Sequence, residues 1–214
     1  MIAASSKDLD RFVASLARVR HRPDLYNPYR GPGGPARRAN LVRYFSLMAA
    51  RSPRYLLVGE AVGYRGGRMS GVPFTSETLL FEGLLDVPVL GTSCGYERAT
   101  RPGPLWREAT ATIVWEALRE SGTLPILWNA LPFHPHRPAQ RLSNRTPRAA
   151  ELQLGSQFLP PLLALFPIKI IIAVGRRAET ALASLGLSYQ PIRHPSHGGK
   201  EAFRAGLEEI FATD

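Results

Sequence analysis

The feature that most constrains the fold is a short, almost wholly apolar run at 168–174, IKIIIAV. A run of this kind is typical of a strand buried on both faces, as in the middle of a parallel sheet. Three further strand-like runs occupy 54–58, 125–128 and 189–192. Because segments with helical periodicity separate these runs, the sequence predicts an α/β fold. We expect a central four-stranded parallel sheet flanked by helices.

Helices are expected between the strands and at both ends of the chain, and all of 1–214 is expected to form a single domain. Ser5 or Ser6 can cap an N-terminal helix that runs to about residue 20. A Pro/Gly-rich arm at 21–38 follows and is predicted to be irregular. Thr146 before Pro147 is a sound helix start. The remaining helices are expected at 39–50, 75–83, 105–120, 147–165, 175–185 and 200–211.

The charge is strongly basic and unevenly placed. The chain carries a net charge of +10, and residues 1–68 hold twelve arginines and one lysine against four acidic residues. A basic surface suits a polyanion such as DNA. The alternative is that the preference for Arg over Lys, 24 to 3, reflects genomic base composition.

Composition also excludes several classes of protein. No run of about 18 apolar residues is present, so no membrane span is expected. The N-terminus lacks the pattern of a signal peptide, so we expect a cytoplasmic protein. We also expect a monomer. The single cysteine, Cys94, excludes an internal disulfide framework and any four-cysteine zinc or iron–sulfur site.

Polar or glycine-rich groups follow each of the four expected strands. Glu60 follows the first, Asn129 the second, Gly175-Arg176-Arg177 the third and His194 the fourth. In open α/β sheets, ligands bind beyond the carboxyl ends of the strands. The topology therefore predicts one cleft that holds a carboxylate, an amide and an imidazole.

Each of these groups has a possible chemical task. Asn129 presents a donor and an acceptor together and can read the edge of a nucleobase. His194 can donate a hydrogen bond to charge on a leaving group, and Glu60 can hold a water against a carbon centre. Phe74, in a Gly-Val-Pro-Phe turn, can stack on an extruded base. Taken singly, each residue also has a purely structural interpretation, in the core or in a loop.

The histidines offer a second interpretation. His134, His136, His194 and His197 could together bind a transition metal, as in a metal-dependent nucleic-acid hydrolase. No cluster of Asp or Glu accompanies them, and neither a dinucleotide fingerprint nor a P-loop is present. We therefore expect no cofactor and no metal.

Three separated motifs carry a family resemblance. GEAVG at 59–63 with SGVPFTSE at 70–77, WNALPFHPH at 128–136 and RHPSHGG at 193–199 resemble, in order and spacing, the motifs of the uracil-DNA glycosylase superfamily. The NRTP segment at 144–147 also recurs in that superfamily. With one cysteine, the chain resembles a bacterial branch without the iron–sulfur ligands.

The resemblance implies a base-excision repair glycosylase that hydrolyses the N-glycosidic bond of uracil in DNA, with other deaminated bases left open. It implies that Phe74 stacks on the base, Asn129 reads it, His194 stabilises the departing base and Glu60 positions water. The loop at 195–199 would enter the minor groove. The DNA-contacting residues expected are Arg145, Arg193, Pro195, Ser196, His197, Gly198 and Lys200.

One position departs from the family pattern. Ala61 stands where much of the superfamily places an Asp or Asn that handles the attacking water. This keeps a second function open, a non-catalytic protein that binds damaged or abasic DNA on the same fold.

Overall fold

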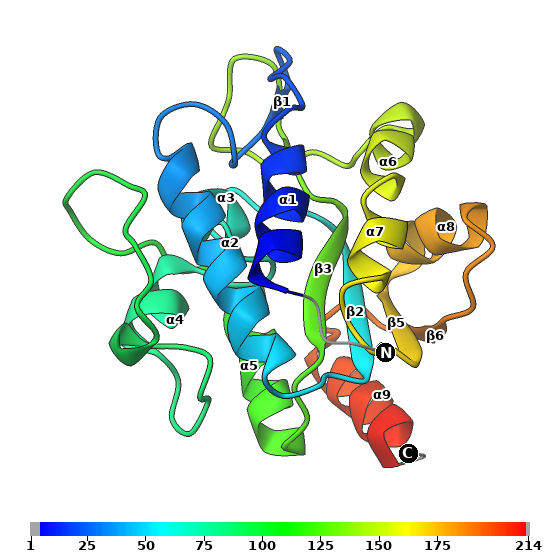
Figure 1. The fold of residues 1–214 in the computed structure, drawn as a ribbon. Helices are drawn as coiled ribbons and strands as arrows, with labels where there is room; N and C mark the ends of the chain where they lie inside the picture. Colours follow the sequence, from blue (N-terminus) through cyan, green and yellow to red (C-terminus); the bar gives the residue numbers. More distant parts are fainter. Residues whose placement is uncertain (1–4, 213–214) are drawn as a thin grey trace.

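Four parallel strands in the order β3-β2-β5-β6 form the central sheet of the computed structural model (Figure 1). The strands are β2 (Tyr55–Ala61), β3 (Ile126–Leu131), β5 (Ile170–Val174) and β6 (Gln190–Ile192). The structure describes residues 5–212. Leu57 lies opposite Leu127 on one side and Ile172 on the other, and all three are fully buried. The predicted fold class, with four parallel strands flanked by helices, is confirmed.

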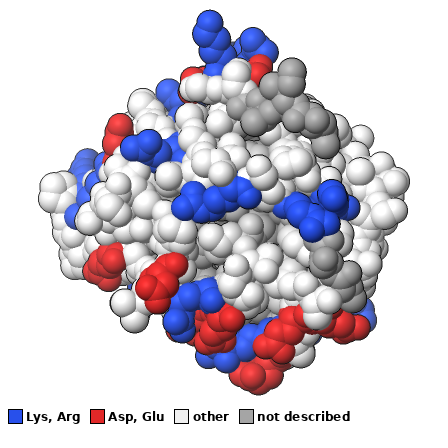
Figure 2. Space-filling view, turned by 60° about the horizontal axis from the view of Figure 1, so that its bottom comes forward, with Lys and Arg blue, Asp and Glu red and all other residues white. Residues whose placement is uncertain are grey.

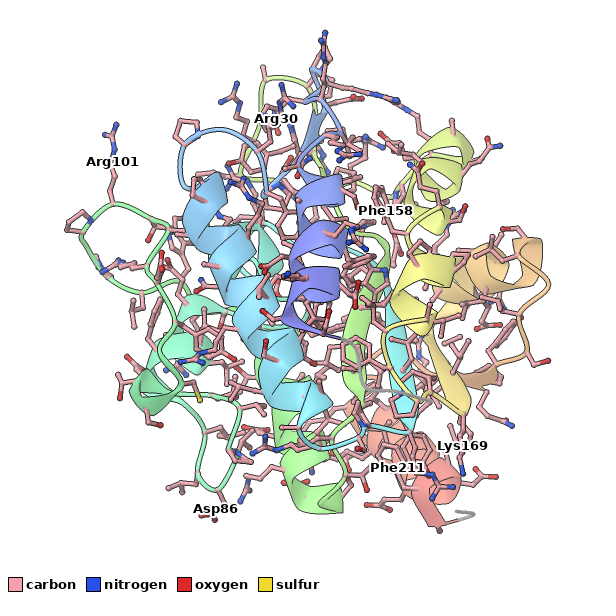
Figure 3. The ribbon with its side chains drawn as sticks, viewed as in Figure 1. Arg30, Asp86, Arg101, Phe158, Lys169 and Phe211 are labelled. Carbon is pink, nitrogen blue, oxygen red and sulfur yellow. The ribbon has the colours of Figure 1, made fainter. Side chains whose placement is uncertain are left out.

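Helices and short elements surround this sheet. They are α1 (Ser6–Leu16), α2 (Gly34–Ala49), α3 (Gly67–Ser70), α4 (Glu77–Glu82), a 3-10 turn at Thr92–Cys94, α5 (Ala109–Ser121), α6 (Ala149–Ser156), α7 (Leu159–Leu163), α8 (Arg176–Ser184) and α9 (Lys200–Ala212). Helices α1 and α2 lie in front of β3 in Figure 1, where Phe12 and Phe45 pack against Trp128. Figure 3 shows side chains filling the interior, with Phe158 beside the sheet, where it packs edge-on against Phe133.

The N-terminal helix begins as predicted. The Ser5 side chain accepts from the backbone N–H of Asp8, and the Asp8 carboxylate accepts from that of Ser5, which satisfies two free donors of the first turn. Beyond the helix, the buried Asn27 amide donates to the carbonyls of Leu16 and Val19, at 2.7 and 2.8 Å. The start of the arm is thereby fixed against the end of α1.

The arm at 21–38 is less irregular than predicted. Leu25–Tyr26 forms a strand, β1, that pairs antiparallel with β4 (His134–Pro135). The prediction is wrong over the last five residues, because α2 already begins at Gly34. Pro35 is tolerated there because proline lacks an N–H, and the N–H groups in the first turn of a helix have no partner within the helix. The arm thus lies against the loop that follows β3.

The helix predicted at 147–165 is two helices. Its start at Thr146-Pro147 is wrong, since the Glu151 carboxylate accepts from the backbone N–H of Arg148 at 2.7 Å and makes Arg148 the cap. The chain breaks after α6 because Pro160 and Pro161 have no N–H to continue the helical ladder.

A buried ion-pair network holds the loop before α6. Arg145 donates to both carboxylate oxygens of Glu151, at 2.9 and 2.7 Å, and Arg148 donates to Asp24 at 2.6 Å. Glu151 is only 1% exposed. The guanidinium of Arg145 is therefore engaged inside the fold, and its side chain is only 17% exposed.

Glu151→Gln should lower the free energy of unfolding by about 3 kcal/mol, because it leaves the Arg145 charge incompletely paired. Glu120→Gln, at an exposed pair with Arg204, should cost less than about 1 kcal/mol. Urea denaturation measures both, and equal losses would contradict the assigned role.

The same network gives a pH dependence. Burial raises the pKa of Glu151, but hydrogen bonds from Arg145 and the Arg148 backbone outweigh it, so the pKa lies below its ordinary value. The stabilisation is therefore present above the unfolded-state pKa and is lost as pH falls through the folded one. The difference between the native protein and Glu151→Gln should accordingly shrink in acid.

Candidate active site

The floor of the site is Gly59, near the carboxyl end of β2. Parallel pairing sets Gly59 opposite Asn129 on β3. A β-carbon at Gly59 would overlap the ring of Phe74 and would lie 3.0 Å from Oδ1 of Asn129. The missing side chain therefore lets an aromatic ring and an amide meet over the end of the sheet.

Phe74 is held in an unusual backbone conformation. Its φ of 52° lies in the left-handed region, which costs a bulky residue about 1–3 kcal/mol. The turn around it is fixed by the Ser70 hydroxyl, which donates to the Thr75 carbonyl at 2.6 Å. The Trp115 indole N–H also donates to the Thr75 hydroxyl, at 3.1 Å. These hydrogen bonds hold Phe74 in its strained backbone conformation. Such maintained strain indicates that the position of the Phe74 ring matters for the site.

The protonation state of His194 follows from its contacts. The backbone N–H of Ser196 donates to Nδ1 at 3.2 Å, and the Ser196 hydroxyl lies 2.7 Å from the same nitrogen. Because a backbone N–H only donates, Nδ1 is the acceptor and the ring proton sits on Nε2. Burial, and then the charges of Arg193 and His197, lower the pKa of His194. The imidazole is thus a neutral donor.

Three of the four groups at the strand ends, together with Phe74, line one cavity, whereas Gly175-Arg176-Arg177 does not. A cavity of about 130 Å³ is lined by Phe74, Asn129, Glu60 and His194. An adjacent cavity of about 150 Å³ shares Glu60 and His194 but is bounded by Pro135 and other residues in place of Phe74 and Asn129. Glu60, Asn129 and His194 therefore lie together as strand order predicts, and the first cavity has the stacking and amide groups that a planar base requires.

Glu60 is the carboxylate common to both cavities. Burial raises its pKa, and the guanidinium of Arg177, in the first turn of α8, opposes the rise. Ala61 lines both cavities without a polar atom in its side chain. Glu60 is therefore placed to hold a water where Ala61 offers no group to do so.

Three polar lining residues carried no predicted role: Asn144, Glu108 and Thr110. Asn144, in the NRTP segment, lines both cavities, and its Oδ1 accepts from the backbone N–H of Tyr64 at 3.1 Å. Glu108 lines only the cavity that contains Phe74 and Asn129. The NRTP motif was a signal for Asn144, whereas no local pattern marks Glu108.

The histidine pair of the FHPH segment faces backbone carbonyls. Nδ1 of His134 donates to the Val62 carbonyl at 2.8 Å, and burial lowers the pKa of His134 to about 4. Nδ1 of His136 lies 2.9 Å from the Arg137 carbonyl. Within residues 5–212, no three His, Cys, Asp or Glu side chains are grouped to hold a metal ion. The metal-site interpretation of these histidines therefore has no geometric support.

The loop after β6 projects beside the cavity. His197 and Gly198 both have left-handed backbone, with φ of 52° and 75°, and both are exposed. A β-carbon at Gly199 would overlap the His194 carbonyl oxygen, so the turn closes tightly behind the imidazole. Arg193 is exposed as well, whereas Pro195 is buried and Lys200 lies 3.5 Å from Glu116. The exposed tip is therefore His197-Gly198.

Charge differs between the two ends of the sheet. The face near the amino ends of the strands carries acidic side chains beside basic ones (Figure 2). Exposed arginines follow the strands at the opposite, carboxyl end: Arg65, Arg137, Arg141, Arg176, Arg177 and Arg193. A polyanion would accordingly meet positive charge around the mouth of the cavity.

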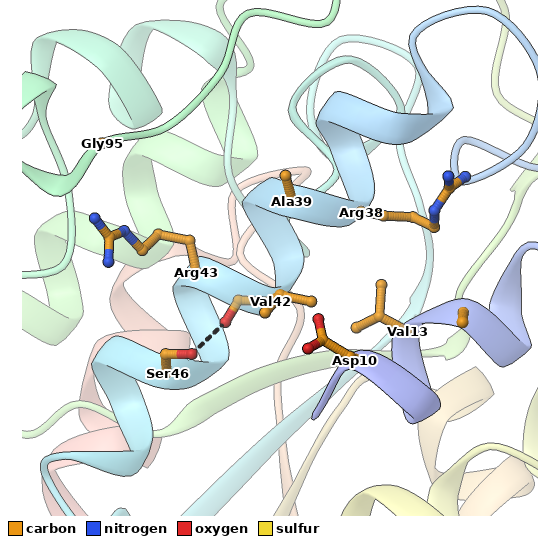
Figure 4. A pocket seen from close by; sticks show the side chains of 9 residues that line it. Asp10, Val13, Arg38, Ala39, Val42, Arg43, Ser46 and Gly95 are labelled. Carbon is orange, nitrogen blue, oxygen red and sulfur yellow. Dashed lines mark hydrogen bonds between the residues drawn. The ribbon is translucent and has the colours of Figure 1, made fainter. Parts of the chain in front are cut away.

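A larger hollow lies elsewhere on the surface. It measures about 550 Å³ and lies between α1 and α2, with Asp10, Val13 and Arg43 in its lining (Figure 4). None of the residues at the strand ends lines it. The site is therefore identified by the chemical groups that line the smaller cavity, and not by the size of a hollow.

Comparison with known proteins agrees with this geometry. A family model described as the Uracil DNA glycosylase superfamily matches residues 45–211, and the chain belongs to this superfamily. A solved structure titled "The crystal structure of WT Pedobacter heparinus SMUG2" aligns with a TM-score of 0.68 at 14% identity, over 99% of this chain and 98% of that one. At such identity the likeness concerns the fold. No curated protein matches.

Membership assigns the chain to the DNA glycosylases, hydrolases that act on DNA. The single cysteine, Cys94, is consistent with a member that carries no iron–sulfur cluster. Among the described helices, none has the length and apolar character required to span a bilayer.

The tautomer of His194 is open to direct measurement. In ¹⁵N-resolved NMR spectra of the ring, Nε2 should carry the proton, and the titration midpoint should lie below the ordinary value of 6.5. The variant His194→Gln assigns the signal by its disappearance. A midpoint above 6.5, or a proton on Nδ1, would contradict the description of a neutral Nε2 donor.

Proposed function

We propose that this protein removes deaminated bases, uracil among them, from DNA as a base-excision repair glycosylase. The observation that carries the proposal is the single cavity lined by Phe74, Asn129, His194 and Glu60. A stacking ring, an amide, a neutral imidazole and a carboxylate are the groups that cleavage of a sugar–base bond requires. The exposed arginines around the cavity mouth supply the contact to phosphates.

Base recognition comes first. The enzyme extrudes the target nucleotide, at a cost of a few kcal/mol that is lowest for mismatched pairs. Phe74 stacks on the base, and the Asn129 amide donates to O4 of uracil and accepts from N3–H. Asn129 is only 3% exposed, so an unsuitable edge would leave its amide buried without partners. Arg193 and the tip at His197-Gly198 enter the minor groove and hold the opened duplex.

Bond cleavage follows. The C1′–N1 bond breaks with its electron pair on the base, and the sugar acquires oxocarbenium character. The Nε2–H of His194 donates to O2 of the departing uracil, where negative charge develops. Glu60 orients the water whose oxygen bonds to C1′, and the proton that this water loses ends on the departing uracil anion, which leaves as neutral uracil. Because His194 is a neutral donor, activity should not require its protonation and should persist above its lowered pKa.

His194→Ala should lower kcat on a uracil-containing oligonucleotide by about 100- to 1,000-fold, since it removes the donor to the leaving group. His197→Ala, on the same loop, should mainly raise KM, because it removes a DNA contact. The assay is formation of an abasic product cleaved by alkali, over a range of salt. A larger kcat loss for His197→Ala would reverse the assigned roles.

A second function has one observation in its favour. Ala61 contributes no polar group where a water-handling side chain is common in the superfamily. A protein without that group could bind abasic DNA and leave bases intact. Tight binding to an abasic oligonucleotide, with no product from uracil, hypoxanthine or xanthine substrates, would establish this function in place of excision.

A further inference from the structure

Glu108 brings a second carboxyl to the site. It lies at the cap position of α5, yet its side chain makes no capping hydrogen bond to that helix. Instead it lines the cavity that holds Phe74 and Asn129, and it is absent from the adjacent cavity beside Pro135. Glu108 therefore belongs to the part of the site that would hold the base, whereas Glu60 borders both parts.

Two glycines make room for this carboxyl. A β-carbon at Gly63 would overlap Oε1 of Glu108, and one at Gly66 would overlap Oε2. Gly63 ends the GEAVG segment, and Gly66 follows in the segment YRGGRM. The chain around 63–66 thus forms a cradle that fits a glutamate side chain and fixes where its carboxyl lies.

The carboxyl has no partner in the free protein. Within the described chain, 5–212, no hydrogen bond or ion pair involves the Glu108 side chain, although its backbone carbonyl accepts from Thr112. Burial alone raises the pKa of Glu108 to about 7. A large share of the molecules therefore present a neutral O–H donor at neutral pH. Glu108 is half-buried, and a donor held partly away from water without a partner is costly unless a ligand satisfies it.

We propose that Glu108 contacts the extruded base and makes this pocket favour deaminated purines, hypoxanthine and xanthine, over uracil. The proposal rests on the base-excision function above and names its preferred substrate class.

The polar groups of the bases explain why the pocket would favour purines over uracil. With Asn129 on N3–H and O4 and His194 on O2, every polar group of uracil is used, and its remaining edge is C5–H and C6–H. Hypoxanthine offers Asn129 the same N–H and C=O pair, at N1 and O6, and its N3 can face His194. Its N7 then remains as an acceptor for the O–H of Glu108. Bound uracil would shut water out of the pocket and leave that O–H without a partner, and polar pockets reject incomplete ligands on this basis.

The same contact assists departure of a purine. When the C1′–N9 bond breaks, its electron pair moves onto the purine ring and the basicity of N7 rises. The hydrogen bond from Glu108 therefore strengthens between ground state and transition state, which is the condition for a contact to raise the rate.

The test compares three variants on three substrates. Oligonucleotides carrying uracil, hypoxanthine or xanthine opposite the same base are assayed under single-turnover conditions. Glu108→Ala should lower the ratio of purine excision to uracil excision by about 10- to 100-fold, as expected for one lost hydrogen bond to the purine. Glu82→Gln, at an exposed glutamate of α4, controls for the loss of one negative charge.

A pH profile separates this contact from a merely structural role. Purine excision by the native protein should fall as pH rises above about 7, because the carboxyl loses the proton it donates. Glu108→Gln keeps a donor of the same shape at every pH. It should therefore retain purine excision and lose this alkaline decline.

The outcomes are distinct. If the native protein releases none of the three bases, the base-excision function itself fails. If it releases them but Glu108→Ala lowers all three equally, or changes none, Glu108 does not select the base and the inference is overturned. An alkaline decline that persists in Glu108→Gln would also overturn it.

Discussion

The close approach over Gly59 is the contact on which the site depends. Parallel pairing of β2 with β3 sets Gly59 beside Asn129, and the absent β-carbon admits the Phe74 ring to the same point. A methyl group there would overlap the ring and crowd the amide. The stacking surface and the base-reading amide are therefore set by the register of two strands and by one missing side chain.

Burial governs the electrostatics around that contact. It raises the pKa of Glu60 and of Glu108, and it lowers the pKa of His194, so each group is shifted toward its neutral form. Outside, exposed arginines follow the ends of the strands. The site thus combines a positively charged rim, which suits the DNA backbone, with an interior of low charge, which suits an uncharged base.

Much of the fold could be predicted because its signals are local. The apolar run at 168–174 predicts a buried strand, and strand order alone predicts the shared edge of Glu60, Asn129 and His194. Departures from the prediction lie in the loop before α6. Glu151, three residues after Arg148, makes Arg148 the cap of α6 and also engages Arg145, which we expected to contact DNA. Asp24, from the arm, accepts hydrogen bonds from both arginines, and a pattern along the chain does not encode a partner from so distant a segment.

The sequence by itself determined the fold class, the superfamily resemblance and four residues that line the cavity, Glu60, Phe74, Asn129 and His194, since each lies in a recognisable motif. Only the tertiary structure brought Glu108 to the cavity and assigned the ring proton of His194 to Nε2. Glu108 lies in none of the three motifs and reaches the site only because α5 begins beside the glycines at 63 and 66. Its burial and lack of partners depend on packing from several segments, which no local run of residues specifies.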